Sequence, residues 1–507
     1  MHAAETTITV HPAFRVGEID HRLFGTFVEH LGRCVYTGIY EPSHPSADEH
    51  GFRGDVAELV RELGPTVVRY PGGNFVSNYR WEDGVGPREQ REPFLDLAWR
   101  TVEPNEVGVD EFLQWCERMD LEPMMAVNLG TRGVDAAAAL VEYCNAEAGS
   151  RWADLRVANG RAEPYGVKLW CLGNEMDGPW QVGHKDADDY GKLAAAAGRA
   201  MKLVDPSIEL VACGSSSMDM PTFGSWERTV LSHCIDVVDH ISMHAYYEQF
   251  GDDRASFLGS ATAMDRFIDR VVALADSVDA EQRTGKQVTI SFDEWNVWYL
   301  HTRFGGGEQA LPVQRDAPRI IEDVYSARDA VVVGDLLITM LNHADRVRIG
   351  CQAQLVNVIA PIMTEPGGAA WRQTTFHPFA ATARLARGAA LDVRIAAPTM
   401  STPRHGDVPM VTAAATWDES AGRFALFLVN RSAEPRTVTV DLSGFDVELT
   451  GGLELVGDDE GPREGRQRAE AVQLVERPAR AGAGGAERIE LSPESWSVWT
   501  GTSVTPA

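Results

Sequence analysis

Two glutamates stand in sequence surroundings that suit acid–base or nucleophilic chemistry. Glu175 lies in the segment 170–180, WCLGNEMDGPW, and Glu294 lies in the segment 290–298, ISFDEWNVW. Each follows a short apolar run, beside an asparagine and aromatic residues. Cleavage of a glycosidic bond needs two carboxyl groups, one to protonate the leaving oxygen and one to attack or to activate water. A single glutamate of this kind is more often a surface charge, but two in such contexts favour a catalytic pair.

The segments around these glutamates belong to a longer alternation of apolar runs and helix-like stretches. The expected strands are 23–28, 66–70, 123–128, 167–173, 208–213, 240–244, 287–292 and 347–353, with helical patterns between them at 110–118, 188–204, 263–278 and 318–342 among others. Nearly continuous apolar runs are typical of parallel strands that are covered on both faces. Repeated strand–helix units of this kind predict an α/β fold, a (β/α)8 TIM barrel.

Polar residues recur where the expected strands end. Active sites of such barrels lie at the carboxyl ends of the strands, so these residues are expected to meet around one opening. On this pattern Glu175 and Glu294 follow the fourth and seventh strands and face each other across the barrel mouth. The other polar clusters at strand ends contain Glu29, Arg69, Asn74, Asn174, His244, Tyr246 and Gln352.

The sequence pattern changes near residue 384. Short alternating runs at 411–417, 423–429, 437–442, 448–456 and 489–500 predict half-exposed antiparallel strands, and hence a β-sandwich. The stretch 5–14 also alternates and is expected to join that sandwich. The expected organisation is therefore an N-terminal strand segment at 1–18, a catalytic barrel at 19–383 and a C-terminal, jelly-roll-like sandwich at 384–507. Residues 457–487, rich in Gly, Arg and Glu, are expected to form a long loop.

The overall composition excludes several classes of function. The 507-residue chain carries a formal net charge of −28, which disfavours binding to nucleic acids and to anionic membranes. The N-terminus has no pattern of a signal peptide, and no run of apolar residues is long enough to span a bilayer, so a cytoplasmic location is expected. The seven cysteines are scattered, which predicts buried thiols rather than a disulfide framework.

Three motifs together resemble glycoside hydrolase family 51, the α-L-arabinofuranosidases within the clan of retaining barrel hydrolases. They are RYPGGNF at 69–75, GNEMDGPW at 173–180 and DEWNVW at 293–298. The likeness runs from about residue 24 to residue 379 and continues more weakly into the β domain. It implies an exo-acting retaining enzyme that removes terminal non-reducing α-L-arabinofuranosyl residues from arabinan- or arabinoxylan-derived oligosaccharides. It also implies a homo-oligomer, since members of this family commonly form hexamers.

The resemblance also assigns roles residue by residue. It makes Glu175 the acid/base, Glu294 the nucleophile and Asn174 the donor to the sugar 2-hydroxyl. Glu29, Asn74 and Gln352 are expected to bind the other hydroxyls, and Arg69 and Tyr246 to hold the nucleophile. Arg69 and Tyr246 are also expected to depress the pKa of Glu294. His244, Trp298 and Trp99 are expected to line the sugar site, although ordinary packing is nearly as good an interpretation of Trp99.

Alternatives remain open at this point. Another hydrolase of the same clan, such as a β-xylosidase or an endoglucanase, would carry the same glutamates, and a non-catalytic carbohydrate-binding barrel is a candidate from another class. His240 and His244 lie four residues apart on one expected strand, but two ligands do not make a metal site. No metal or cofactor is therefore expected. The natural polysaccharide, the linkage preference and the role of the β-sandwich are not determined by the sequence.

Overall fold

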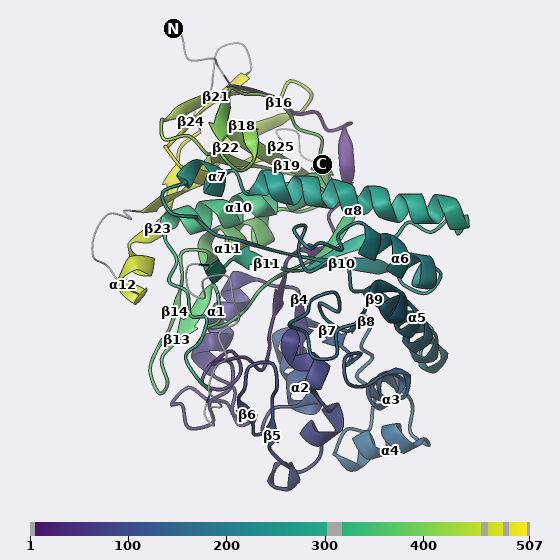
Figure 1. Cartoon of the computed structure of the whole chain (residues 1–507). Helices are drawn as coiled ribbons and strands as arrows, with labels where there is room; N and C mark the ends of the chain where they lie inside the picture. The colour runs from purple at the N-terminus through teal and green to yellow at the C-terminus, as the bar shows by residue number, and fades with distance from the viewer. Residues whose placement is uncertain (1–5, 302–316, 458–464, 480–485, 504–507) are drawn as a thin grey trace.

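The computed structural model describes residues 6–301, 317–457, 465–479 and 486–503 of the chain. It combines a closed barrel of parallel strands, wrapped by helices, with a second unit that is rich in β-sheet (Figure 1). The fold is therefore a TIM barrel with a β-sandwich, as the sequence predicts. Among these residues there is no helix with the length and apolar character that a membrane crossing requires.

The barrel contains eight parallel strands, each at the place that the apolar runs predict. Around the barrel they follow the order β10-β11-β12-β3-β4-β7-β8-β9, which closes on itself. In chain order they are β3 (Gly25–Phe27), β4 (Val67–Tyr70), β7 (Glu122–Ala126), β8 (Leu169–Leu172), β9 (Glu209–Ala212), β10 (His240–Tyr247), β11 (Thr289–Val297) and β12 (Val347–Gln352). Because all strands run in one direction, their carboxyl ends meet at one rim of the barrel.

A separate buried cluster contains side chains from five of the barrel strands. Its members on those strands are at most 2% exposed: Val67, Met124, Ala126, Leu169, Cys171, Val211, Ile349 and Cys351. Gly25 of β3 lies against this cluster, since a Cβ there would approach Val67 Cγ1 to 2.6 Å and Cys351 Sγ to 2.8 Å. These contacts indicate a packed interior rather than a pore. All seven cysteines of the chain are buried and unpaired, which confirms the prediction from their spacing.

Helices cover the outside of the barrel (Figure 1). They are α1 (Gly54–Leu63), α2 (Val109–Met119), α3 (Val134–Asn145), α4 (Arg151–Ala158), α5 (Ala187–Val204), α6 (Ser225–Cys234), α7 (Arg254–Leu258), α8 (Ala261–Gln282), α10 (Ala327–Asn342) and α11 (Phe376–Leu385). The short turns are η1 (His21–Leu23), η2 (Asn74–Asn78), η3 (Trp81–Gly84) and η4 (Arg88–Gln90), and β5 (Phe94–Leu95) pairs with β6 (Val102–Glu103).

Helix α10 begins later than the predicted helix 318–342. Ser326 caps its first turn. The Ser326 hydroxyl accepts a hydrogen bond from the backbone N–H of Asp329, and the Asp329 carboxylate accepts one from the backbone N–H of Ser326. Such a capping box fixes the first residue of a helix, here Ala327. The helix also joins the two units, because the carboxylate of Asp335 accepts hydrogen bonds from Arg431 and Thr412 of the sheet-rich unit.

The sheet-rich unit contains a four-stranded sheet, β16-β1-β21-β24, and a seven-stranded sheet, β2-β15-β19-β20-β25-β22-β23. The strands are β1 (Thr6–Thr9), β2 (Arg15–Glu18), β15 (Ala389–Leu391), β16 (Arg394–Ala396), β19 (Val411–Asp418), β20 (Arg423–Asn430), β21 (Arg436–Asp441), β22 (Val447–Gly457), β23 (Val472–Arg477), β24 (Ala486–Leu491) and β25 (Ser495–Ser503). The N-terminal strands thus pair with C-terminal ones, and β1 lies between β16 and β21.

Two details of this unit differ from the sequence prediction. The expected loop 457–487 contains helix α12 (Gly465–Glu470) and strand β23, which pairs with β22; residues 458–464 and 480–485 lie outside the described part. The short run at 472–477 is isolated among Gly, Arg and Glu residues, so its pattern is weak. The single strand expected at 489–500 is two strands, β24 and β25, because the chain turns at Glu494, whose φ of 42° lies in the left-handed region.

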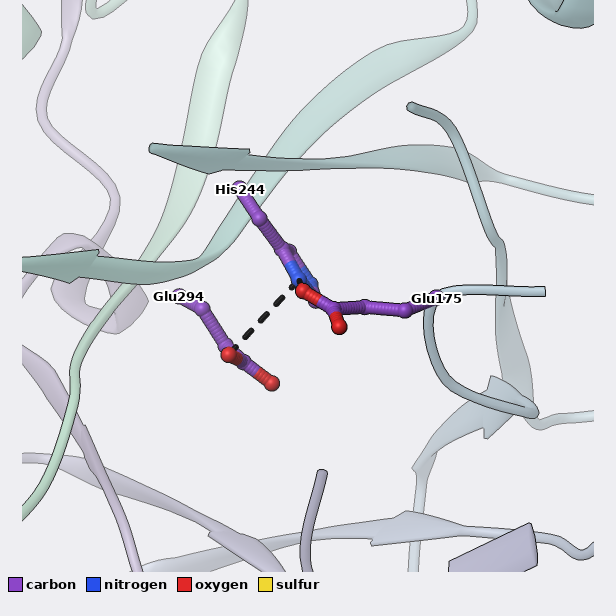
Figure 2. A group of neighbouring side chains, drawn as sticks. All are labelled: Glu175, His244 and Glu294. Atoms are coloured by element: carbon purple, nitrogen blue, oxygen red, sulfur yellow. Dashed lines mark hydrogen bonds and ion pairs between the residues drawn. The ribbon is translucent and has the colours of Figure 1, made fainter. Parts of the chain in front are cut away.

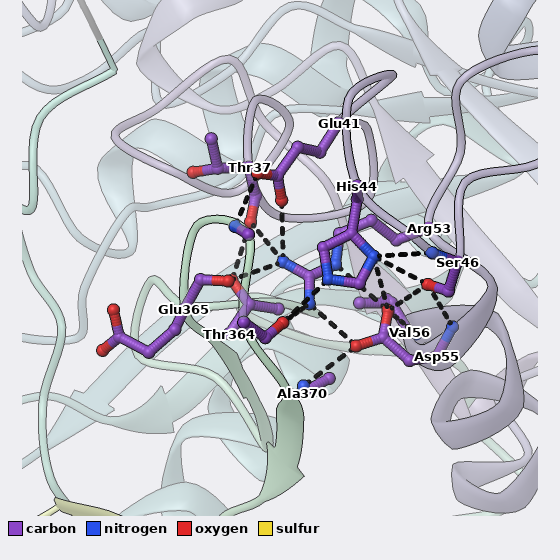
Figure 3. A network of polar contacts seen from close by, with 12 residues as sticks. Thr37, Glu41, His44, Ser46, Arg53, Asp55, Val56, Thr364, Glu365 and Ala370 are labelled. Carbon is purple, nitrogen blue, oxygen red and sulfur yellow. Dashed lines mark hydrogen bonds and ion pairs between the residues drawn. The ribbon is translucent and has the colours of Figure 1, made fainter.

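A buried arginine fixes the long loop that follows β3. Arg53 donates to the carboxylates of Glu41 and Asp55 and to backbone carbonyls of Glu365 and Gly368 (Figure 3). The two carbonyls belong to the turn between β13 (Ile362–Thr364) and β14 (Ala370–Arg372). Segments about 310 residues apart are therefore held together by one guanidinium group, with every nitrogen of that group bonded.

Candidate active site

The two candidate glutamates lie together at the carboxyl-end rim of the barrel. Glu175 follows β8 by three residues and has a φ of 41°, a strained conformation for a residue with a side chain. Glu294 lies within β11. Their side chains point toward His244 of β10 (Figure 2), and one carboxylate oxygen of each lies within 4.8 Å of the other and of a His244 ring nitrogen. The structure therefore brings Glu175 and Glu294 into the facing arrangement that the strand order predicts.

Glu294 is held by a cation on one oxygen and a hydroxyl on the other. Arg69 Nη1 donates to Glu294 Oε1 at 2.8 Å, and the Tyr246 hydroxyl donates to Oε2 at 2.7 Å. Both partners are those that the sequence predicts. The prediction of a depressed pKa is wrong, however. Burial raises the pKa of Glu294 and the nearby charge of Glu175 raises it further, which outweighs the lowering by His244, Arg69 and Tyr246. The extent to which Glu294 is buried is not visible in the local sequence.

His244 joins the two glutamates to a third carboxylate. Its Nδ1 lies 2.8 Å from Glu175 Oε1, and its Nε2 lies 3.0 Å from Asp293 Oδ1. Burial alone would lower the pKa of His244, but Glu294, Asp293 and Glu175 raise it well above the ordinary value. A carboxylate at each ring nitrogen suits the imidazolium form, which donates from both nitrogens. Glu175, His244 and Glu294 also have the spacing of a metal-ligand group, but both ring nitrogens of His244 already bond carboxylates.

The surroundings of Glu175 differ from those of Glu294. Its second oxygen, Oε2, accepts a hydrogen bond of 2.6 Å from the indole nitrogen of Trp180, which is 36% exposed. Asn174, the preceding residue, accepts a hydrogen bond from Arg69 Nη2 at 2.6 Å and donates to Asn74 Oδ1 at 3.3 Å. Arg69 thus fixes both the nucleophile candidate and the asparagine that the sequence predicts to contact the sugar.

Glu29 follows β3 and is buried close to Glu294. Its carboxyl group accepts hydrogen bonds from the backbone N–H of Phe75, from Trp99 Nε1 at 2.9 Å and from Gln354 Nε2 at 2.9 Å. Burial raises its pKa to about 8, with a further contribution from the charge of Glu294, although the Phe75 and Trp99 donors oppose the shift. Trp99, for which ordinary packing is nearly as good an interpretation, therefore contacts a site residue directly.

Gln352, which the resemblance assigns to a sugar hydroxyl, bonds a side chain that is not among the predicted sugar-binding residues. Its side-chain nitrogen donates to Asn296 Oδ1 at 3.2 Å, whereas Gln354, two residues later, donates to Glu29. Strand β12 ends at Gln352, so the alternation of faces within the strand does not extend to Gln354. Asp293 and Trp180 also lie in the site without a predicted role. Asp293 and Trp180 lie inside the two glutamate motifs, and that position is the sequence feature that could have identified them as site residues.

A cavity of about 1130 Å³ opens over these residues. Asn74, Trp99, Glu175, Tyr246 and Trp298 line it, and the rings of Tyr246 and Trp298 meet edge to face at 5.0 Å. Aromatic faces of this kind suit the C–H surfaces of a sugar, while the carboxyl and amide groups suit its hydroxyls. The arrangement has the parts needed to bind a sugar ring and to carry out acid-assisted nucleophilic displacement at it.

Comparison with known proteins agrees with this chemistry. Residues 59–265 match the model of the α-L-arabinofuranosidase 1 domain, and residues 293–495 match that of the α-L-arabinofuranosidase C-terminal domain. An intracellular exo-α-(1→5)-L-arabinofuranosidase of Halalkalibacterium halodurans is 53% identical over 441 residues, covering 87% of this chain and 88% of that protein. An exo-α-(1→6)-L-arabinofuranosidase of Bifidobacterium longum is 54% identical over 437 residues, covering 85% of this chain and 84% of that protein.

Solved structures give the same result. The family 51 α-L-arabinofuranosidase AbfB of Bifidobacterium longum superposes with a TM-score of 0.92 at 49% identity, covering 98% of this chain and 99% of that one. The α-L-arabinofuranosidase of Thermotoga maritima, solved as an arabinose complex, superposes with a TM-score of 0.86 at 32% identity, covering 98% of this chain and 99% of that one. With its barrel, its paired glutamates and these relatives, the chain belongs to the α-L-arabinofuranosidases of glycoside hydrolase family 51.

Proposed function

We propose that this α-L-arabinofuranosidase is a retaining enzyme that works by double displacement through a covalent glycosyl-enzyme. The observation that carries the proposal is the short separation of the two carboxyl groups, within 4.8 Å between one oxygen of each. Retaining glycosidases hold their carboxyl groups about 5–5.5 Å apart, whereas inverting ones need about 6.5–9.5 Å to place a water molecule. The space between Glu175 and Glu294 suits direct attack on the sugar.

In the first step a carboxylate oxygen of Glu294 forms a bond to the anomeric carbon as the bond to the leaving oxygen breaks. Glu175 gives its proton to that oxygen, so the alcohol departs neutral. Arg69 and Tyr246 keep the attacking carboxylate in place through their hydrogen bonds. Asn174, fixed by Arg69, is positioned to donate to the 2-hydroxyl as positive charge develops on the ring.

In the second step water attacks the anomeric carbon and gives a proton to Glu175, and the bond to Glu294 breaks. Both residues return to their starting states. His244 contacts Glu175 at 2.8 Å and Glu294 at 3.6 Å, so its positive charge offsets whichever carboxylate is ionised at each stage. Glu29, Asn74, Trp99 and Trp298 are proposed to bind the remaining hydroxyls and faces of the furanose.

We further propose that the substrates are arabinan- or arabinoxylan-derived oligosaccharides, from which a terminal non-reducing residue is removed. Residues 19–383 would form the catalytic barrel, with 1–18 and 384–507 as its β-sandwich. The relatives' names include both α-(1→5) and α-(1→6) activities at similar identity, so linkage is left open. Several relatives are named intracellular, which supports a cytoplasmic location, and a homo-oligomer, with a hexamer as its form, remains part of the proposal.

Hydrolysis of p-nitrophenyl α-L-arabinofuranoside, compared with the β-xyloside and the β-glucoside, tests the substrate. A preference for the arabinoside is expected. A preference for the xyloside or glucoside would favour a different hydrolase of the clan, and no turnover of any glycoside would favour a binding protein. Methanolysis of the arabinoside tests the mechanism separately. The methyl α-arabinofuranoside is the expected product, and the β-anomer would exclude double displacement.

A further inference from the structure

The cavity over the two glutamates continues well beyond the residues that would hold one furanose ring. Its inner end is lined by Asn74, Trp99 and Glu175. Its outer end is lined by Met218 and Asp219, by Phe250, by the side chains of Arg266 and Arg270, and by Arg404 with His405. An exo-acting enzyme needs only one subsite for the sugar that it removes, so the outer end is available for the group that leaves.

The outer end is built jointly by the barrel and the sheet-rich unit. A hairpin of strands β17 (Thr399–Thr402) and β18 (Gly406–Pro409) has Arg404 and His405 in its turn. The backbone N–H of Arg404 donates to Ser256 Oγ at 3.1 Å, and Arg266 donates to the carbonyl of His405 at 3.1 Å. The guanidinium of Arg404 also lies over the ring of Phe250, 3.7 Å from its centroid. The hairpin turn is therefore fixed against the barrel rim.

Three guanidinium groups meet there without a carboxylate partner in the described part of the chain. Arg266 bonds a backbone carbonyl, Arg270 contacts the sulfur of Met218 at 3.2 Å, and Arg404 contacts an aromatic face. In a chain with 74 acidic and 46 basic residues, unpaired arginines on one wall of a substrate cavity run against the overall charge.

Acidic residues line the same cavity as these arginines. Asp253 accepts a hydrogen bond from the backbone N–H of Ser256 and caps α7, while Glu248 bonds to His301. Asp219, Asp253 and Glu248 all line the cavity, and their negative charges oppose those of the arginines, so binding of a carboxylate there depends on the local geometry of the guanidinium groups.

The leaving group departs from the side of the cavity that holds the acid. Trp180 bonds Glu175 Oε2, while Ser216, whose backbone N–H donates to Asp177, lies two residues before Met218, which contacts Arg270. A sugar that accepts the proton of Glu175 would therefore extend toward Met218, Arg270 and the hairpin. Exposed Phe250 and Trp180, at 39% and 36%, supply apolar faces for sugar rings along this path.

We propose that this outer end is a leaving-group subsite for a carboxylate-bearing sugar, a hexuronate, recognised by Arg270, Arg404 and Arg266. A hexuronate combines ring faces that stack on aromatic side chains with a planar carboxylate, which a guanidinium fork binds through two hydrogen bonds. The inference rests on the proposed function, since it concerns the group that the hydrolysis releases. Preferred substrates would carry arabinofuranose on an acidic oligosaccharide.

The test compares two oligosaccharides that differ only in the leaving sugar, α-L-arabinofuranosyl galacturonate and α-L-arabinofuranosyl galactose. At low salt the native enzyme is expected to show kcat/KM about fivefold higher for the galacturonate, a ratio in the range of partly exposed charged hydrogen bonds. The ratio should approach one at high salt. A ratio at or below one at low salt would overturn the proposal.

Variants locate the effect. The double variant Arg270→Gln/Arg404→Gln is expected to bring the ratio to about one while kcat/KM for the galactose substrate stays unchanged. Arg61→Gln, an exposed arginine of α1 that does not line the cavity, removes a charge elsewhere and should preserve the ratio. An unchanged ratio in the double variant, or equal losses on both substrates, would exclude recognition of the carboxylate. Turnover of p-nitrophenyl α-L-arabinofuranoside by the native enzyme reports on the proposed function independently.

Discussion

Two buried arginines of this molecule, Arg53 and Arg69, have similar partners and opposite consequences. Arg53 lies between Glu41 and Asp55, and Arg69 lies beside Asp293 and Glu294. All nitrogens of Arg53 are hydrogen-bonded, whereas Arg69 Nε is 3.5 Å from Asp293 Oδ2 and makes no hydrogen bond. One arginine has a saturated set of partners, and the other has an incomplete one.

The carboxylates respond in opposite directions. Burial would raise the pKa of Asp55, but Arg53, Ser46 and the backbone N–H of Ala370 lower it to about 2. Burial does raise the pKa of Glu294, since Arg69 is shared with other groups and Glu175 adds negative charge. The comparison teaches that an arginine stabilises a carboxylate only as far as the remaining contacts allow. The incomplete set goes with a raised pKa of Glu294, while the complete one holds two loops together.

Neutralising one carboxylate at each arginine should separate these roles most clearly. Glu294→Gln is expected to lower kcat by at least about a thousandfold, because the amide cannot form the glycosyl-enzyme. Glu41→Gln makes the same change beside Arg53 and should leave kcat within about twofold while lowering Tm. Steady-state kinetics and thermal melts measure both. Comparable kcat values in the two variants would remove the functional distinction between the arginines.

Loss of the proton donor should depend on the leaving group. Glu175→Ala is expected to reduce kcat/KM for an arabino-oligosaccharide by about 10²–10⁴-fold, the usual contribution of a general acid. The loss should be much smaller for an aryl arabinoside whose leaving group needs no proton. Parallel kinetics on the two substrates provide the measurement. Equal losses would show that Glu175 does not act as the acid.

Removal of each arginine should affect stability unequally. Arg53→Met leaves Glu41 and Asp55 without their cation and several backbone carbonyls without a donor, so a loss of about 3–5 kcal/mol in the free energy of unfolding is expected. Arg69→Met removes hydrogen bonds to side chains only, and its main effect should fall on kcat. Urea unfolding compares the two. A larger loss of unfolding free energy for Arg69→Met would show that Arg69, and not Arg53, has the larger structural role.

The smallest expected effects are on the pH dependence of stability. The folded-state pKa of Asp55, about 2, lies below its ordinary value of 3.8, so its contribution is present above about pH 4 and is lost as pH falls toward 2. The pKa of Glu29 is raised from 4.5 to about 8, so native stability should fall as pH rises between these values. Asp55→Asn should flatten the dependence of the free energy of unfolding on pH in the acid range, and Glu29→Gln should flatten it in the neutral range. Urea unfolding across pH measures both. Parallel profiles for both variants would contradict the opposite shifts.

The sequence predicts the barrel and most of the site because their signals are local. Each barrel strand is a continuous apolar run, and Arg69, Asn174 and Tyr246 follow from motifs beside such runs. The sequence does not distinguish Gln352 from Gln354. Two residues at positions i and i+2 point to the same face for as long as a strand continues, and the sequence does not show where this strand ends. The raised pKa of Glu294 depends on burial and on contacts between distant strands, which no local pattern contains.

The hairpin β17–β18 illustrates the same limit at larger scale. Its residues 399–409 carry no motif, and their place at the cavity depends on contacts with Ser256, Arg266 and Phe250, more than 130 residues earlier. Strand β23 was missed for a related reason, because six residues with weak alternation become a strand only when β22 offers an edge. Elements that need a distant partner are the ones that sequence patterns miss.

The position of strand β1 has a consequence for the order in which the chain folds. Thr6–Thr9 lie between β16 and β21, so this strand pairs with strands made about 390 and about 430 residues later. At about 5–20 residues per second, this segment waits tens of seconds for its neighbours. Until then the barrel can form while β1 is unpaired, and the four-stranded sheet is completed only after β24 has been made.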